Sequence, residues 1–118
     1  MGRRRVVVTG MGVVTPLGST VDQFWSHLIA GKSGIDFVTK VNKGDFPAKV
    51  AGEVKDFDPL LYMDKKESKR MDLFTQYAVG AAKMAVEDAK LTIDETNANE
   101  VGVWVGSGIG GMATYEEQ

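Results

Sequence analysis

Residues 4–18 read RRVVVTGMGVVTPLG: a charged start, three consecutive valines, then a glycine-rich turn. A short apolar run bounded by charge and by glycine is typical of a fully buried strand in a parallel sheet. The strand is predicted over Arg4 to Thr9. An extended loop is expected to follow, because Pro16 disfavours helical geometry at Thr15. The stretch predicts an opening strand of an α/β protein.

A second apolar run also ends in glycines. We predict a buried strand over Val101-Gly102-Val103-Trp104-Val105, which leads into Gly106-Ser107-Gly108-Ile109-Gly110-Gly111. Glycine makes up 14 of the 118 residues, against a usual share of about 7%. Much of the excess lies in these two clusters. Because only glycine takes a positive φ without cost, both are interpreted as turns where backbones pack closely.

Two helices are predicted between these strands. The first has Thr20 as its N-cap, Gln23 completing a capping box and Gly31 as its C′ glycine. Its apolar stripe, which needs a sheet beneath it, comprises Val21, Phe24, Trp25, Leu28 and Ile29. The second helix is predicted over Asp72 to Ala89 as a central, largely buried element. Its broad face of mostly small residues comprises Phe74, Tyr77, Ala78, Ala81, Ala82, Ala85 and Ala89.

Shorter elements are predicted between and after the helices. Residues 32–47 read as polar and irregular, and Lys49 to Val54 as a short strand. Asp58-Pro59 predicts an N-cap followed by proline at the first helical position. Asp64 and Glu67 form a second capping pattern. The last residues, from Tyr115 to Gln118, read as the start of another helix.

The order of these elements predicts an α/β fold in which a parallel sheet is favoured. No linker, repeat or low-complexity tract divides the chain. Residues 1–118 are therefore expected to be one incomplete domain, with no separate second domain.

Composition argues against several kinds of protein. The net charge of −2 is unlike that of nucleic-acid-binding domains, which are strongly basic. The chain has no cysteine, which rules out disulfides and thiol catalysis by its own residues, and the single His27 cannot form a histidine cluster. We interpret His27 as surface or boundary structure and not as a catalyst. The apolar runs are too short for a signal peptide or a membrane span. A cytoplasmic protein without metal or cofactor is expected.

The second glycine cluster leaves one alternative open. Gly106-x-Gly108-x-x-Gly111 matches the dinucleotide-binding fingerprint and follows a predicted strand. A Rossmann site also needs an acidic residue about 20 positions further on, beyond Gln118. In the first cluster, Thr15 stands in place of the third glycine and Pro16 would disturb the helix start. A dinucleotide-binding domain stays an alternative.

A basic run, Lys65, Lys66, Lys69 and Arg70, also has two interpretations. It is either a solvated helix face or a docking patch for an acidic partner, where charge speeds encounter and sets orientation.

Several blocks of the chain, in their order, resemble the β-ketoacyl-acyl-carrier-protein synthases. They are residues 4–18, Gly31-Lys32-Ser33-Gly34-Ile35, Lys55-Asp56-Phe57, Met71-Asp72-Leu73-Phe74-Thr75-Gln76-Tyr77-Ala78 and residues 106–111. The likeness is greatest to the elongating enzymes of bacterial type II fatty-acid synthesis. It implies the opening portion of a thiolase-like, layered αβαβα fold.

The resemblance also implies a reaction. Members of the family accept an acyl chain on a cysteine thiolate, decarboxylate malonyl-carrier-protein, and let the carbanion attack the thioester; two histidines stabilise the developing negative charge. The complete protein is then an acyltransferase and a homodimer. This chain lacks the cysteine, and His27 matches neither histidine, so the isolated chain is expected to be inactive. An alternative on the same fold is a catalytically silent, chain-length-factor-like subunit of polyketide synthesis.

Two candidate sites are implied residue by residue. Ile109 matches the residue that lines the acyl-binding pocket near the dimer interface. Lys66, Lys69 and Arg70 match the basic positions that dock the acidic acyl carrier protein in its acyl- and malonyl-loaded forms. No cofactor is implied.

Overall fold

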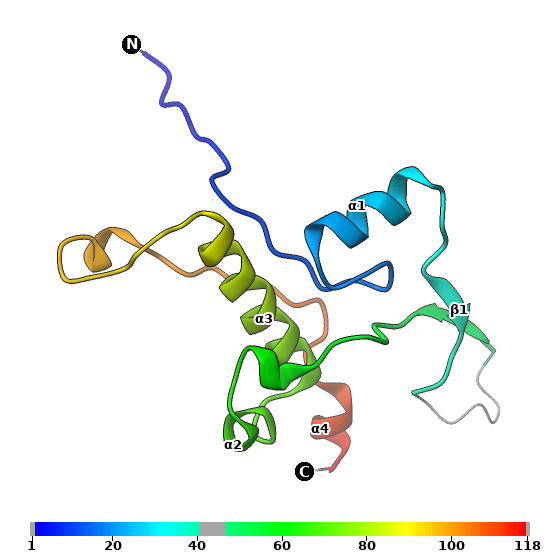
Figure 1. Ribbon diagram of the computed structural model, residues 1–118. Helices are drawn as coiled ribbons and strands as arrows, with labels where there is room; N and C mark the ends of the chain where they lie inside the picture. Colours follow the sequence, from blue (N-terminus) through cyan, green and yellow to red (C-terminus); the bar gives the residue numbers. More distant parts are fainter. Residues whose placement is uncertain (1, 41–46, 118) are drawn as a thin grey trace.

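The computed structural model describes residues 2–40 and 47–117 (Figure 1). Residues 41–46, part of the segment predicted to be irregular, lie outside this description. The longest helix, α3, occupies the centre, with α1 and the two strands on one side and α2 and α4 near its first turn (Figure 1). The elements are α1 (Val21–Ile29), β1 (Ile35–Phe37), β2 (Val50–Gly52), η1 (Pro59–Leu61), α2 (Lys65–Ser68), α3 (Leu73–Asp88), η2 (Ala98–Glu100) and α4 (Met112–Glu117).

Helix α1 begins and ends at the predicted residues. The Thr20 side chain accepts a hydrogen bond from the Gln23 N–H. In a capping box the Gln23 side chain would accept from the Thr20 N–H. Here it accepts from the N–H of the preceding residue, Ser19, at 3.2 Å. At the other end Gly31 has φ +67°. Hydrogen bonds from the Gly31 and Lys32 N–H groups to the carbonyls of Leu28 and His27 complete a Schellman motif.

The first glycine cluster crosses α3 at backbone contact. A Cβ at Gly10 would lie 2.5 Å from the Ala89 nitrogen, and one at Gly12 would lie 2.8 Å from the Met84 Cβ and overlap the Ala81 carbonyl oxygen. Between the two glycines, the Met11 N–H donates to the Asp88 carboxylate at 2.8 Å. The predicted close approach of small residues is thus confirmed, and it joins segments more than 70 residues apart.

A second contact on α3 is aromatic. The Phe57 ring stacks on Tyr62 with centroids 5.6 Å apart and meets Tyr77 edge-to-face at 5.1 Å. The Phe57 ring also lies where a Cβ of Gly80 would stand, and Gly80 is the buried residue of α3. These contacts fix the η1 region against the middle of the helix.

The strands β1 and β2 form an antiparallel pair in which Ile35 faces Gly52 and Phe37 faces Val50. The prediction of a strand within residues 49–54 is confirmed. The irregular structure predicted over residues 32–47 is wrong at β1, because β-branched and aromatic side chains there find a partner strand. The parallel sheet favoured from the sequence is absent from the described part of the chain, where the sheet is this antiparallel pair.

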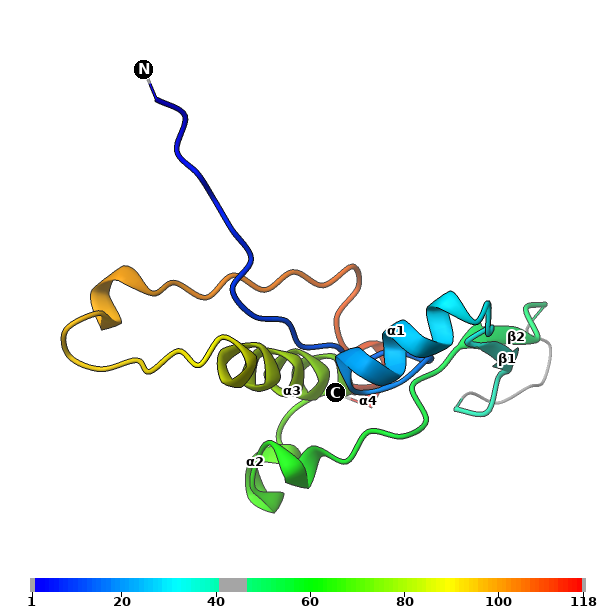
Figure 2. The same cartoon turned by 45° about the horizontal axis from the view of Figure 1, so that its top comes forward.

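Both predicted buried strands are wrong for this structure. Residues 4–9 and 101–105 are extended but belong to no sheet within the described ranges (Figure 2). Val6 is 92% exposed and Trp104 is 98% exposed. An isolated extended segment has no neighbour to accept its hydrogen bonds or to cover its side chains. The sequence pattern is that of a buried strand, but neither segment finds a partner among the described residues.

The exposed apolar surface extends to the helices. Among described hydrophobic residues only Val38 and Met63 are buried, so α3 is not the largely buried helix that was predicted. The accessible surface is 10010 Å², against about 6,300 Å² expected for a folded monomer of this mass. The radius of gyration is 17.4 Å, against about 13.5 Å. The described residues do not enclose a core of their own. Among the described helices, none has the length and apolar character needed to cross a membrane.

The Gly12 contact gives a first prediction. We expect Gly12→Ala to lower the free energy of unfolding of the whole protein by about 1–3 kcal/mol, because the new methyl group overpacks against α3. Gly2→Ala is the matched control, since a Cβ there meets nothing within 4 Å and Gly2 lies outside the predicted strands. Urea unfolding of both variants checks this, and equal losses would contradict the packing argument.

Glu53 gives a second prediction. Its carboxylate accepts hydrogen bonds from the Thr39 hydroxyl at 2.6 Å and from the N–H groups of Thr39 and Lys40 at 3.0 and 2.9 Å. These bonds hold the pKa of Glu53 below its ordinary 4.5, and the bond from the Thr39 hydroxyl has the largest effect. A lowered carboxyl pKa stabilises the loop above pH 4.5, and the contribution is lost as pH falls through the lowered value.

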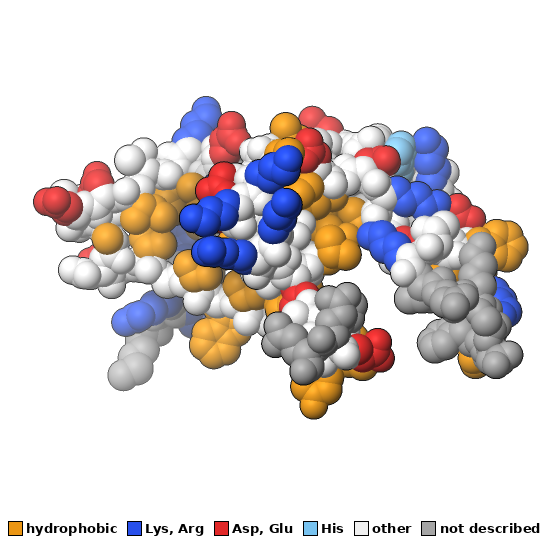
Figure 3. Space-filling model, turned by 90° about the horizontal axis from the view of Figure 1, so that it is seen from below, with side chains coloured by type: hydrophobic (Ala, Val, Ile, Leu, Met, Phe, Trp, Pro, Cys, Tyr) orange, Lys and Arg blue, Asp and Glu red, His pale blue; other side chains and the backbone are white. Residues whose placement is uncertain are grey.

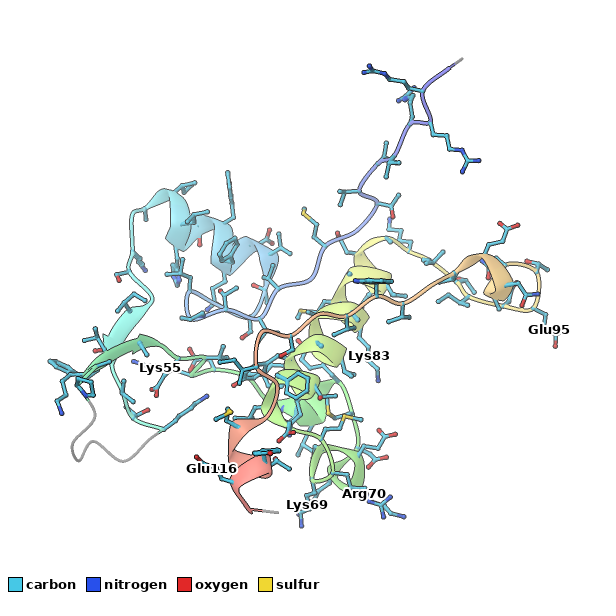
Figure 4. The ribbon with its side chains drawn as sticks, turned by 180° about the vertical axis from the view of Figure 1, so that it is seen from behind. Lys55, Lys69, Arg70, Lys83, Glu95 and Glu116 are labelled. Atoms are coloured by element: carbon cyan, nitrogen blue, oxygen red, sulfur yellow. The ribbon has the colours of Figure 1, made fainter. Side chains whose placement is uncertain are left out.

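Hydrogen exchange of the Thr39 and Lys40 amides measures this loss, as protection relative to intrinsic rates at each pH. We expect protection to fall below pH 4.5 in the whole protein and to be low and pH-independent in Glu53→Gln. Glu95→Gln, on a side chain that points away from the molecule (Figure 4), is the control and leaves the profile unchanged. A wild-type profile in Glu53→Gln would refute the assignment.

Candidate functional site

The first candidate site is the loop of residues 106–111 that enters α4. The Ser107 hydroxyl accepts from the Gly110 N–H at 3.0 Å, and Gly110 has φ +80°, a conformation that favours glycine. Ile109 stands between them and is 77% exposed. A Cβ at Gly106 or Gly108 would meet nothing within 4 Å, so this half of the loop lies in open space.

The far end of the loop is attached to the start of α3. Gly111 lies against the Asp72 carboxylate, which occupies the place of its missing Cβ. The Thr114 hydroxyl, one turn into α4, donates to the same carboxylate. Asp72 is the N-cap of α3, but its side chain accepts no capping hydrogen bond from the helix. Such a cap ordinarily stabilises a helix by about 0.5–2 kcal/mol, so Asp72 uses its carboxylate between helices instead.

Two hollows flank this contact. One, of about 220 Å³, is lined by Asp72, Leu73, Phe74, Gly110, Gly111 and Met112. The other, of about 570 Å³, is lined by Asp72, Gly111, Thr114 and Tyr115. Ile109 lines neither hollow, so its predicted role in an acyl pocket stays a prediction.

The same geometry argues against a bound dinucleotide. In a Rossmann site the glycine turn lets the diphosphate approach the helix that follows. Here the Asp72 carboxylate lies against Gly111, so two negative groups would compete for one place. In the first cluster, Gly10 and Gly12 lie against the backbone of α3, which leaves no room for a diphosphate.

The second candidate site is the basic patch of Lys66, Lys69 and Arg70. Asp64 caps α2 by accepting from the Lys66 and Glu67 N–H groups at 2.7 and 2.8 Å, as the sequence predicted. Residues at i, i+3 and i+4 share one face of a helical turn. All three side chains are exposed, and Lys69 and Arg70 point away from the rest of the molecule (Figure 4).

The patch is available to a partner. None of its three side chains makes an ion pair or hydrogen bond with another residue in the described ranges. Seen from below, lysine and arginine side chains gather over the part of the molecule that holds α2 (Figure 3). By contrast, Lys55 is engaged: it pairs with Asp36 at 2.6 Å, and its hydrogen bond lowers the pKa of that carboxyl. Both partners are exposed, so the pair contributes little to stability.

His27 has a structural role. Its Nδ1 lies 2.6 Å from the Leu17 carbonyl oxygen. Because a carbonyl only accepts, Nδ1 carries the proton. Leu17 belongs to the tight turn closed by hydrogen bonds between Thr15 and Gly18. The bond ties that turn to α1, in agreement with His27 as boundary structure.

Sequence reasoning missed the contact between Asp72 and Thr114. Asp72 was visible only as the first residue of a predicted helix, and Thr114 lies 42 positions away with no pattern that links the two. Gly111 was the available signal, because a glycine at a helix start suggests that another group approaches closely. It does not show which group that is.

Comparison with known proteins shows to which family the chain is similar. The family described as "Beta-ketoacyl synthase, N-terminal domain" matches residues 3–118. The chain is 50% identical over 117 residues to 3-oxoacyl-[acyl-carrier-protein] synthase 2 of Coxiella burnetii, which covers 99% of the chain and 28% of that protein. It is 47% identical over 116 residues to the protein of that name from Synechocystis sp., covering 98% of the chain and 28% of the relative.

A solved structure is similar as well. "The ishigamide ketosynthase/chain length factor" superposes with a TM-score of 0.71 at 42% identity, covering 77% of this chain and 23% of that one. The chain thus spans little more than a quarter of the length of the curated relatives named above. With a family match from residue 3 to residue 118, the chain belongs to the β-ketoacyl synthases and represents their N-terminal domain.

Proposed function

We propose that the protein containing this chain is a 3-oxoacyl-acyl-carrier-protein synthase of fatty-acid elongation. The observation that carries the proposal is an identity of about half to enzymes of that name along almost the whole chain. In the reaction, a cysteine thiolate takes an acyl group from its carrier. Malonyl-carrier-protein loses CO₂, and the resulting carbanion attacks the acyl thioester. The thiolate leaves, and the product is a β-ketoacyl chain on the carrier protein.

The catalytic groups are proposed to come from elsewhere in the protein. The chain has no cysteine, and the Nδ1 proton of its one histidine is used in the bond to Leu17. We assign binding and shaping roles to the present residues. Ile109 forms part of the wall for the acyl chain, and Lys66, Lys69 and Arg70 receive the carrier protein. A second copy of the protein completes a homodimer.

The finer fold is also a proposal. Residues 4–9 and 101–105 have the apolar pattern of buried strands but no partner within the described chain. We propose that they pair within the central sheet of a layered, thiolase-like αβαβα fold when segments that correspond to the rest of the relatives' length are present. The exposed apolar stripe of α1, with Trp25 59% exposed, supports this arrangement because it too needs a covering layer.

The basic patch suits a carrier protein for an electrostatic reason. Three exposed cations, one on α2 and two just after it, create a local positive field in a chain whose net charge is −2. An acidic partner is drawn to such a field and oriented by it before contact.

Condensation by the whole protein is the direct test. Acyl- and malonyl-carrier-protein are incubated with it, and mass spectrometry follows the β-ketoacyl product and the acylated enzyme. We expect both species.

The similar solved structure is described as a ketosynthase together with a chain length factor, which favours a second candidate, a silent subunit. That candidate predicts no acylation alone and condensation only beside a catalytic partner. Both candidates are overturned if the protein shows no condensation alone and none beside a catalytic partner.

The docking role gives a third prediction. We expect Lys66→Glu, Lys69→Glu and Arg70→Glu together to raise KM for acyl-carrier-protein by roughly tenfold or more at low salt, because the field that steers the partner is reversed. The difference should shrink as salt screens exposed charges. Steady-state kinetics across a salt series measures both effects.

A control with the same change in net charge separates docking from charge alone. Arg3→Glu, Lys32→Glu and Lys90→Glu also reverse three exposed cations, but none of them belongs to the patch. We expect this variant to keep a KM near the wild-type value. The docking assignment fails if both triple variants raise KM equally, or if neither does.

The acyl-wall role gives a fourth prediction. Ile109→Phe adds bulk where the acyl chain would lie, so we expect kcat/KM to fall more for long acyl chains than for short ones. The volume-conserving Ile109→Leu should keep the wild-type profile. Competition between carrier-bound acyl chains of different length measures the ratio. A uniform loss across all lengths in Ile109→Phe would show that Ile109 does not line the acyl site.

A further inference from the structure

We infer that Asp72 and Thr114 form a clamp that positions the loop of residues 106–111, and that through this loop they set how strictly the enzyme discriminates between acyl chains. Asp72 and Thr114 are positioning residues in this account. The role in acyl-chain discrimination rests on the proposed function, whereas the clamp itself rests on contacts within the described chain.

The first step is the use that Asp72 makes of its carboxylate. A helix-capping aspartate normally accepts from the N–H groups of its own first turn. Asp72 has the extended backbone of an N-cap, with φ −61° and ψ 156°, yet it makes no such bond. Its oxygen instead accepts from the Thr114 hydroxyl of α4, and both residues are partly buried. The contact therefore joins two helices at the expense of the usual cap.

The second step is that the clamp is the attachment of the loop. Gly111 admits the Asp72 carboxylate only because it has no Cβ. The Gly111 carbonyl then accepts from the Tyr115 N–H at 3.0 Å, which starts α4. The positions of Gly102, Gly106 and Gly108 have open space around them. Within the described structure the loop is thus held at its last two residues and unsupported before them.

The third step links the clamp to Ile109. Only Gly110 separates Ile109 from the clamped Gly111, and consecutive Cα atoms are about 3.8 Å apart. The Gly110 backbone is itself set, by φ +80° and by the bond from its N–H to Ser107. A shift of Gly111 away from Asp72 therefore moves Ile109 directly. A looser clamp lets this side chain yield to longer acyl chains.

Isosteric variants of the whole protein test the clamp. Thr114→Val keeps the shape and removes the donor, whereas Thr114→Ser keeps the donor. We expect Thr114→Val to speed hydrogen exchange of the hydrogen-bonded amides at the held end of the loop, those of Gly110 and Tyr115, by about fivefold, the factor for one lost hydrogen bond. Thr114→Ser should behave as wild type. Thr75→Val makes the same chemical change within α3, on a hydroxyl with no hydrogen bond to another described residue, and should leave the loop unchanged.

The second readout is the ratio of condensation rates for long and short acyl chains. We expect Thr114→Val to raise the long-to-short ratio by between about two- and fivefold, up to the factor that one hydrogen bond can supply, and Thr114→Ser to leave it unchanged. Faster loop exchange with an unchanged ratio would overturn the discrimination role. Unchanged exchange in Thr114→Val would overturn the clamp.

The two proposals fail in distinguishable ways. Should wild-type protein show no condensation at all, the proposed function and the discrimination role fall together, while the exchange measurement still decides whether the clamp exists. Should Thr114→Ser loosen the loop as much as Thr114→Val, the cause is packing and the hydrogen bond to Asp72 is not the positioning contact.

Discussion

The described structure depends on one close approach, in which Gly10 and Gly12 lie directly against the backbone of α3. Backbones come this near only where neither side carries a bulky group, and here glycine faces Ala81, Ala85 and Ala89. The hydrogen bond from the Met11 N–H to Asp88 fixes the register of the crossing. Because this contact closes a loop of more than 70 residues, it determines where everything between its ends can lie.

Both candidate sites adjoin the start of helix α3. Its N-cap, Asp72, holds the loop that contains Ile109, and the basic residues Lys69 and Arg70 lie just before its first turn. The Gln76 side chain donates to the carbonyls of Ser68 and Met71 and so joins α2 to α3. The proposed carrier-docking patch and the proposed acyl-wall loop lie at the same end of α3, an arrangement in which one rigid element would hold the delivered substrate close to its pocket.

The exposed apolar surface fits a chain that covers about a quarter of its relatives. Val6, Trp104 and the stripe of α1 are exposed although their pattern is that of a core. Polar capping and turn contacts need only a few neighbouring residues, so Thr20, Asp58 and Asp64 make theirs within the chain. Burial of a sheet requires distant segments on both faces.

The family was predictable from blocks that follow one another along the chain. The elements that follow from local chemistry were also predictable from the sequence: the ends of α1 and α3, the proline-led turn at Asp58 and the cap at Asp64. Each depends on residues a few positions apart, such as Thr20 with Gln23 or Gly31 with its preceding turn. The sequence could not show that the Asp72 carboxylate bonds to Thr114 instead of capping its own helix, or that β1 pairs antiparallel with β2. Nor could it show that the two valine-rich segments find no partner strand among the described residues. Those outcomes depend on which distant groups meet in space. A pattern along the chain shows that a residue requires burial or a hydrogen-bond partner, but it does not identify the partner.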